Sequence, residues 1–194
     1  MPHSTIANAF LPPSAPDCYT RVPVIESLKI VLTCIVAAIF YGVVHDQFTA
    51  RICLEYFTVF HPPIFSTQSP TLLALGWGII ATWSVGAILG FLLAIASRVG
   101  SRPKLPVVAL LTPIVRLLLI MGASAALSGF AGFILARRGT IAPPEWVASA
   151  LPPADYPGFM ADWYAHSASY AVGFIGGLTL CITQFRRRGR VLKH

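Results

Sequence analysis

Four long apolar stretches with almost no charged residues constrain what this chain can fold into. They cover residues 28–44, 71–96, 114–136 and 163–185. A helix that rises about 1.5 Å per residue needs roughly 20 apolar residues to cross a hydrocarbon layer about 30 Å thick. The last three stretches reach that length directly. The first is short, and we expect its helix to begin near Leu28, with the Lys29 side chain extending to the lipid head groups.

The composition supports a membrane protein rather than a soluble domain. Hydrophobic residues make up 56% of the 194 positions and charged residues only 11%, compared with about 25% charged residues in soluble domains. A soluble fold with this composition would have too little polar surface. We therefore predict an all-α integral membrane four-helix bundle in contact with the lipid bilayer. Its spans are expected at about 28–47, 71–97, 114–136 and 163–185.

The remaining segments are too short for a second domain. Residues 1–23 contain five prolines, which predicts a mobile tail ahead of a membrane domain over 24–185. A basic tail follows at 186–194. Residues 47–60, written as a helix, carry polar side chains on one stripe and apolar ones on the other, which is typical of an outward-facing interfacial helix.

The basic residues predict the orientation of the chain. Its net charge of +7 would suggest a nucleic-acid partner in a soluble protein, but here lysine and arginine gather at the ends of the spans. Four spans place eleven of these residues on the side of the two termini and three on the other side. Because basic loops remain in the cytoplasm, we expect both termini to be cytoplasmic, in the plasma membrane, with no nucleic-acid partner.

The polar residues that could serve a function fall on the predicted outward side. Asp162 and His166 are four residues apart and therefore share one helix face. On a continuous helix Asp46 lies almost opposite Glu55, whereas Arg51 and Glu55 form an ordinary i,i+4 ion pair. The candidates for an outward polar vestibule are His45, Asp46, Arg51, Glu55, His61, Asp162 and His166.

Three interpretations of these polar residues stay open. They are a polar site for protons or a substrate, a metal site, or side chains that only face the lipid head groups. Histidine and carboxylate ligands favour zinc, iron or manganese, although the spacing matches no established zinc pattern. The metal candidates are His45, Asp46, Glu55, His61, Asp162 and His166. No phosphate loop or nucleophile elbow is present, and the sequence identifies no cofactor.

Two further features concern packing and lipid. Arg116 either contacts an anion or lipid head group or simply extends to the membrane edge. The pairs Gly86/Gly90 and Gly173/Gly177 form GxxxG motifs, which allow helices to approach closely. We expect these motifs to pack within the chain rather than between two copies of it.

The segment HDQFTARICLEYFTVFHPP, residues 45–63, resembles a segment of uncharacterised bacterial polytopic inner-membrane proteins. The resemblance implies a small helical protein of the bacterial inner membrane and brings no known activity. Three functional hypotheses follow from the residues. The chain is a transport or permeation protein, alone, as a homo-oligomer or as a subunit of a membrane complex; a metal-assisted enzyme at the outer face; or a non-catalytic assembly partner. The sequence does not decide whether it is an enzyme.

Overall fold

The computed structural model describes residues 18–190, with side chains described from 24 to 189. Over this range the chain is helical and has no strand. Four of its helices are long and apolar enough to cross a membrane, which confirms the predicted all-α, four-span fold. The elements are α1 (Cys18–Ile52), α2 (Leu54–Thr58), α3 (Pro70–Arg98), α4 (Val108–Arg137), α5 (Glu145–Ala148), the short 3-10 helix η1 (Pro153–Asp155) and α6 (Tyr156–Arg190).

Helix α3 has nearly the predicted bounds, whereas α1, α4 and α6 extend beyond theirs. Helix α4 begins at Val108 and continues through Pro113, which removes only one hydrogen bond close to the helix start. Leu110 and Ile114 are buried in one cluster with Ile30 and Leu93. Burial of these side chains favours the helical conformation ahead of the proline, so α4 begins before the span predicted at 114–136.

The interfacial helix predicted at 47–60 is divided into two parts. Helix α1 runs on to Ile52, and Cys53 then adopts an extended conformation (φ −143°, ψ 100°) before α2 begins. The predicted tails also differ from the observed helices. Residues 18–23 belong to α1 and residues 186–190 to α6, whereas 1–17 and 191–194 lie outside the described residues.

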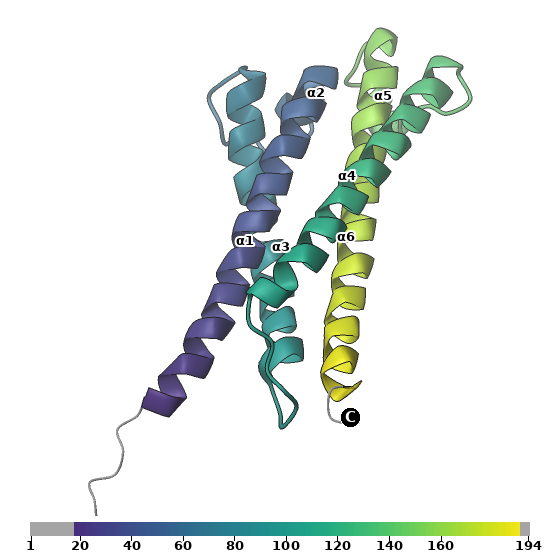
Figure 1. Cartoon of the computed structure of the whole chain (residues 1–194). Coiled ribbons are helices and arrows are strands. Elements are labelled where there is room, and N and C mark those ends of the chain that lie inside the picture. The colour runs from purple at the N-terminus through teal and green to yellow at the C-terminus, as the bar shows by residue number, and fades with distance from the viewer. Residues whose placement is uncertain (1–17, 191–194) are drawn as a thin grey trace, which may run out of the picture.

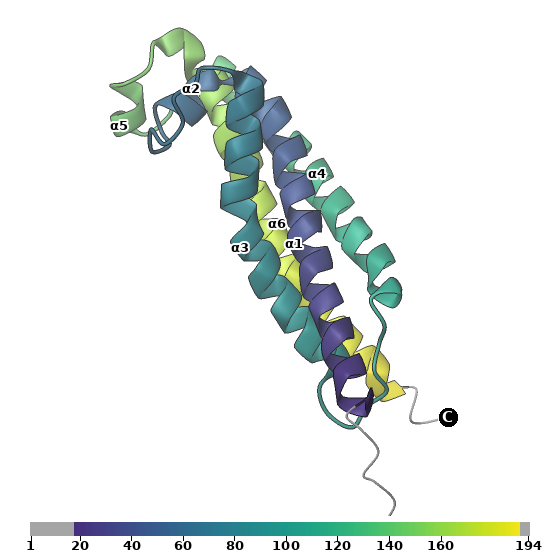
Figure 2. The same ribbon diagram turned by 90° about the vertical axis from the view of Figure 1, so that its left-hand side faces the viewer.

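The bundle consists of two tightly packed helix pairs. Helix α1 packs mainly against α3, and α4 mainly against α6, with sparser contact between the pairs (Figures 1 and 2). Glycines bring α1 and α3 together: a Cβ placed on Gly78 would lie 2.6 Å from the Val43 backbone, and one on Gly86 would lie 2.8 Å from the Ile35 Cα. Gly90 faces the Val31 backbone in the same way. The Gly86/Gly90 motif therefore packs within the chain, as expected.

The two ends of the bundle differ. The start of α1, the α3–α4 connection and the end of α6 lie at one end, which we call the tail end, and α2 and α5 lie at the other, the α2/α5 end (Figures 1 and 2). At the tail end, Arg188 is fully buried although it lies in the basic C-terminal segment. Its guanidinium donates hydrogen bonds of 2.7–3.0 Å to the carbonyl oxygens of Ala96, Val99, Arg102 and Pro103. Arg188 thus links α6 to the end of α3 and to the α3–α4 connection by hydrogen bonds.

Candidate functional site

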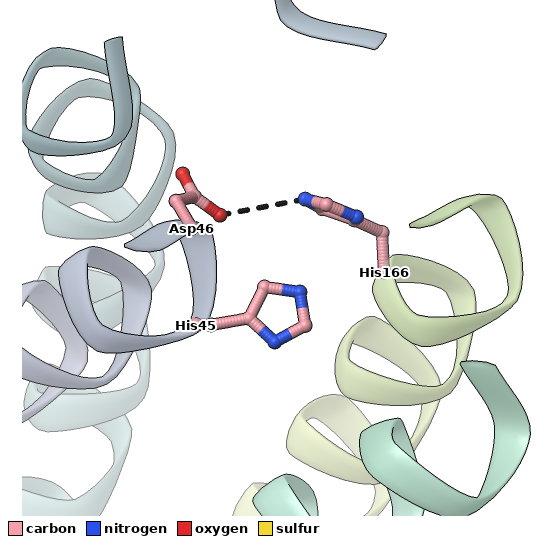
Figure 3. A group of neighbouring side chains, drawn as sticks. All are labelled: His45, Asp46 and His166. Carbon is pink, nitrogen blue, oxygen red and sulfur yellow. Dashed lines mark ion pairs between the residues drawn. The ribbon is translucent and has the colours of Figure 1, made fainter. Parts of the chain in front are cut away.

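His45 and Asp46 on α1 face His166 on α6 near the α2/α5 end (Figure 3). We call these three residues the triad. His166 Nε2 lies 3.4 Å from Asp46 Oδ1, and both side chains are only 8% exposed. One ligand atom from each residue can be chosen so that all three atoms lie within 4.8 Å of one another. The triad therefore combines two imidazoles and a carboxylate contributed by both helix pairs.

The hydrogen bonds of the triad define which ring nitrogens are available. His166 Nδ1 donates to the backbone carbonyl oxygen of Asp162 at 2.8 Å. Nδ1 therefore carries a hydrogen, and Nε2 is directed at Asp46. The His45 and His166 rings meet edge to face with centroids 4.6 Å apart. His45 Nε2 is buried and has no hydrogen-bond partner among the described residues, which makes it available to a ligand.

Aromatic and hydroxyl side chains enclose the triad. Tyr56 stacks on the His166 ring with centroids 4.6 Å apart and an interplanar angle of 24°. Tyr41 stacks on His45 at 5.7 Å, and its hydroxyl lies 2.7 Å from that of Ser169 in a hydrogen bond between α1 and α6. Such packing restricts the orientations of the two imidazoles.

These enclosing residues were not predicted from the sequence, although spacing could have indicated some of them. Tyr41 precedes His45 by four residues, and Ser169 and Tyr170 follow His166 by three and four. Residues at these separations share a helix face. Tyr56 has no such signal, because it reaches His166 only through the break between α1 and α2 at Cys53.

Asp162 is the buried carboxylate closest to the triad in sequence. It lies one turn before His166 on α6 and is fully buried; its carboxylate oxygens make no hydrogen bond of ordinary geometry among the described residues, although the Cys53 backbone lies close enough to interact with them. It is near enough to Asp46 for the two carboxylates to interact electrostatically. A buried carboxylate without a partner is costly unless a cation or a proton compensates it, so this end of the bundle favours a positive charge.

His61 lies beside the triad but has partners of its own. Its Nδ1 donates to the Tyr56 carbonyl oxygen at 2.7 Å, and its ring packs on Phe57 and Trp77. Burial lowers the pKa of His61; the hydrogen bond to Tyr56 opposes this shift, His166 adds to it, and Asp46 opposes it. His61 is therefore held as a mainly neutral imidazole against the aromatic wall.

Arg51 and Glu55 are not drawn into the triad. Arg51 is exposed and donates hydrogen bonds to Gln47 Oε1 and Thr71 Oγ1, both at 2.8 Å. Glu55 lies near Cys53 Sγ and lines a separate pocket of about 320 Å3. The ion pair expected between Arg51 and Glu55 is not among the described ion pairs, because the extended Cys53 ends the helix that would have placed them four residues apart on one face.

A cavity of about 420 Å3 extends from the triad into the bundle between the two helix pairs. It reaches Cys34 on α1 and Cys181 on α6, which are 11 and 15 residues away from His45 and His166, or about 16–22 Å along the helices. Apart from the polar end its lining is mainly apolar, and the Thr82 hydroxyl within it donates to the Gly78 carbonyl of its own helix.

The cavity borders the lipid-facing surface between α3 and α6. Val85 and Ile88 on α3 and Phe174 on α6 line it and are also 44–63% exposed. The site is therefore an apolar chamber with one polar end and a lateral boundary at the bilayer.

Comparison with family models, with curated proteins and with solved structures finds no match for the chain. Functional inference therefore depends on the geometry of the triad and the cavity.

Proposed function

We propose that this membrane protein binds an amphiphilic, lipid-like molecule within the bilayer. The apolar part of the ligand would occupy the chamber between the helix pairs, and its polar head would contact the triad. The observation that carries this proposal is the combination of an apolar cavity of about 420 Å3 with buried polar residues at one end only.

The dimensions and chemistry of the chamber support this class of ligand. Binding pockets commonly have volumes of about 300–1,000 Å3 and apolar walls with a few polar groups that orient the ligand. The length of about 16–22 Å along the helices suits an extended apolar chain. Imidazole and carboxylate groups of His45, Asp46 and His166 would exchange hydrogen bonds with a hydroxyl, carbonyl or similar polar head.

The chemistry of the cavity lends less support to ion permeation. Beyond the triad and the adjacent hydroxyl groups of Tyr41, Ser169 and Tyr170, the cavity wall is apolar apart from Thr82, Cys34 and Cys181. An ion that passes an apolar wall loses its hydration without compensation. The hypothesis of transport, alone or as a subunit of a larger assembly, is tested by proton, metal and solute flux in reconstituted vesicles. Absence of flux in both the wild type and Asp46→Asn would exclude the transport hypothesis.

The proposed setting is the bacterial plasma membrane, with both termini in the cytoplasm and the triad near the outer face. The excess of basic residues on the side of the termini supports this orientation. An enzymatic role at the outer face and a non-catalytic role in assembly are the alternatives. A bound amphiphile that is recovered chemically altered would favour the enzyme.

Mass spectrometry of the intact purified protein tests the binding proposal. We expect a lipid-like adduct of defined mass to survive exchange into a detergent. Ala81→Phe places a ring in the cavity, because Ala81 lines it, and should reduce adduct occupancy at least fivefold. Ala126→Phe is the matched control, since Ala126 is an exposed residue outside the cavity lining. Equal occupancy in both variants, or no adduct in the wild type, would contradict the proposal.

A further inference from the structure

We propose that His45, Asp46 and His166 form a binding site for one divalent transition-metal ion. The ligands are one imidazole nitrogen from each histidine and one carboxylate oxygen of Asp46, brought within 4.8 Å of one another by α1 and α6 (Figure 3). The metal site shares the triad with the proposed amphiphile, but metal binding depends on the three side chains and not on the apolar chamber, so the two proposals can fail separately.

The observed separations suit a metal site. Zinc binds imidazole nitrogen and carboxylate oxygen at about 2.0–2.2 Å, so two ligands of a tetrahedral ion lie about 3.3–3.5 Å apart. The 3.4 Å between His166 Nε2 and Asp46 Oδ1 already has this value. The three ligand atoms lie within 4.8 Å of one another, which exceeds the separation in a tetrahedral site by about 1–1.5 Å. Side-chain rotation of His45 can supply this movement.

The hydrogen-bonding of the two histidines suits metal ligation. A ligating histidine usually donates its other N–H to a carbonyl or carboxylate, which fixes the tautomer and directs the basic nitrogen at the ion. His166 does this through Nδ1 and the Asp162 carbonyl oxygen. His45 Nε2 is buried without a hydrogen-bond partner among the described residues, so binding a ligand breaks no existing hydrogen bond of this nitrogen.

The charge of the surroundings also favours a cation. Asp46 and Asp162 bring two buried carboxylates to this region, and no lysine or arginine forms a described ion pair with either of them. A divalent ion bound by two neutral imidazoles and Asp46 would compensate both carboxylates. Two imidazoles and a carboxylate suit zinc, iron or manganese and leave at least one coordination position for water or another ligand.

Metal content of the purified, tag-free protein tests the site. We expect protein incubated with Zn2+ and then dialysed to retain about one ion per chain, and His45→Ala, Asp46→Ala and His166→Ala each to retain less than a tenth of that. His61→Asn is the matched control, because His61 is a nearby histidine with its own partners, and it should retain the ion. Fewer than one ion in ten wild-type chains, or full retention by the three triad variants, would overturn the proposal.

A measurement on the wild type keeps the test decisive if a triad variant does not fold. X-ray absorption of the Zn2+-loaded protein should show only nitrogen and oxygen neighbours, with the scattering pattern of two imidazoles. Sulfur in the coordination shell would overturn the assignment, since Cys53, Cys34 and Cys181 are the described thiols. Metal retention in Ala81→Phe, despite loss of the lipid adduct, would show that metal binding does not depend on occupancy of the chamber.

Discussion

Single side chains at the two ends of the bundle have opposite electrostatic roles. At the α2/α5 end, Asp46 and Asp162 place two carboxyl groups in a buried region. At the tail end, the buried Arg188 brings positive charge to a group of carbonyl oxygens. Among the described residues no lysine or arginine forms an ion pair with these two carboxyl groups, which favours a cationic ligand, whereas the contacts of Arg188 are complete within the chain and stabilise it.

Replacing His61 should reduce the dependence of stability on pH. The folded protein holds the pKa of His61 below its ordinary value, mainly through burial, so the unfolded chain binds more protons between the folded pKa and about 6.5. Stability is therefore fully present above pH 6.5 and falls as the pH decreases through this window. Thermal unfolding in detergent should show a smaller loss of Tm between pH 7.5 and 5.5 for His61→Asn than for the wild type. An equal or larger loss would refute the role of His61.

Arg188→Ala should destabilise the protein strongly. The substitution removes the charged donor of four partly buried carbonyl oxygens, which costs about 3 kcal/mol. Arg188→Lys should recover only part of this loss, because one ammonium group cannot reproduce the planar fork of the guanidinium. The neighbouring exposed residue provides the control: Arg187→Ala should change the unfolding free energy by no more than about 0.5 kcal/mol. Denaturation by SDS measures these differences, and similar values for both alanine variants would contradict the structural role.

At the scale of elements, the contact between α1 and α3 depends on glycine. Gly78→Ala should cost about 1–3 kcal/mol, because the added methyl group would meet the Val43 backbone, which cannot rotate away. Gly122→Ala is the matched control, since its nearest neighbour is Tyr41 Cε2 at 3.9 Å, an ordinary contact distance. We expect this variant to be as stable as the wild type or slightly more stable. The same SDS assay compares the two, and equal losses would show that the close approach is not critical.

The number and type of the helices could be predicted from the sequence, but some of their ends could not. Apolar length predicts a span, because lipid requires every backbone group to be hydrogen-bonded within the helix. The extension of α4 ahead of Pro113 depends on burial of Leu110 against Ile30, and this contact joins residues 80 positions apart. The break at Cys53 likewise has no local signal, since neither glycine nor proline occurs between Gln47 and Phe60.

The candidate site was predicted in part. Helical spacing correctly put Asp162 and His166 on one face, and the span count put both on the same side as His45 and Asp46. Which of the seven polar candidates meet depends on the rotation of α1 against α6, and a single sequence does not specify this rotation. Arg51 and Glu55 consequently lie apart from the triad, and the contribution of Tyr56 was missed.

At the scale of the whole molecule, the arrangement of the ends predicts a labelling pattern. Ser101, in the α3–α4 connection, and Ser149, after α5, are exposed residues at opposite ends of the bundle. In a variant whose native cysteines are replaced by alanine, a membrane-impermeant maleimide added to intact cells should label Ser149→Cys and spare Ser101→Cys. Opening the cells should allow both to react. The reverse pattern would contradict the orientation inferred from the basic residues.

The lateral boundary of the chamber between α3 and α6 has a consequence for how occupancy is measured. An amphiphile that enters from the bilayer competes with the surrounding acyl chains. Saturation of the chamber is therefore governed by the mole fraction of the amphiphile among the lipids and not by its molarity in the buffer. Diluting proteoliposomes with water should leave occupancy unchanged, whereas fusing them with empty vesicles should lower it.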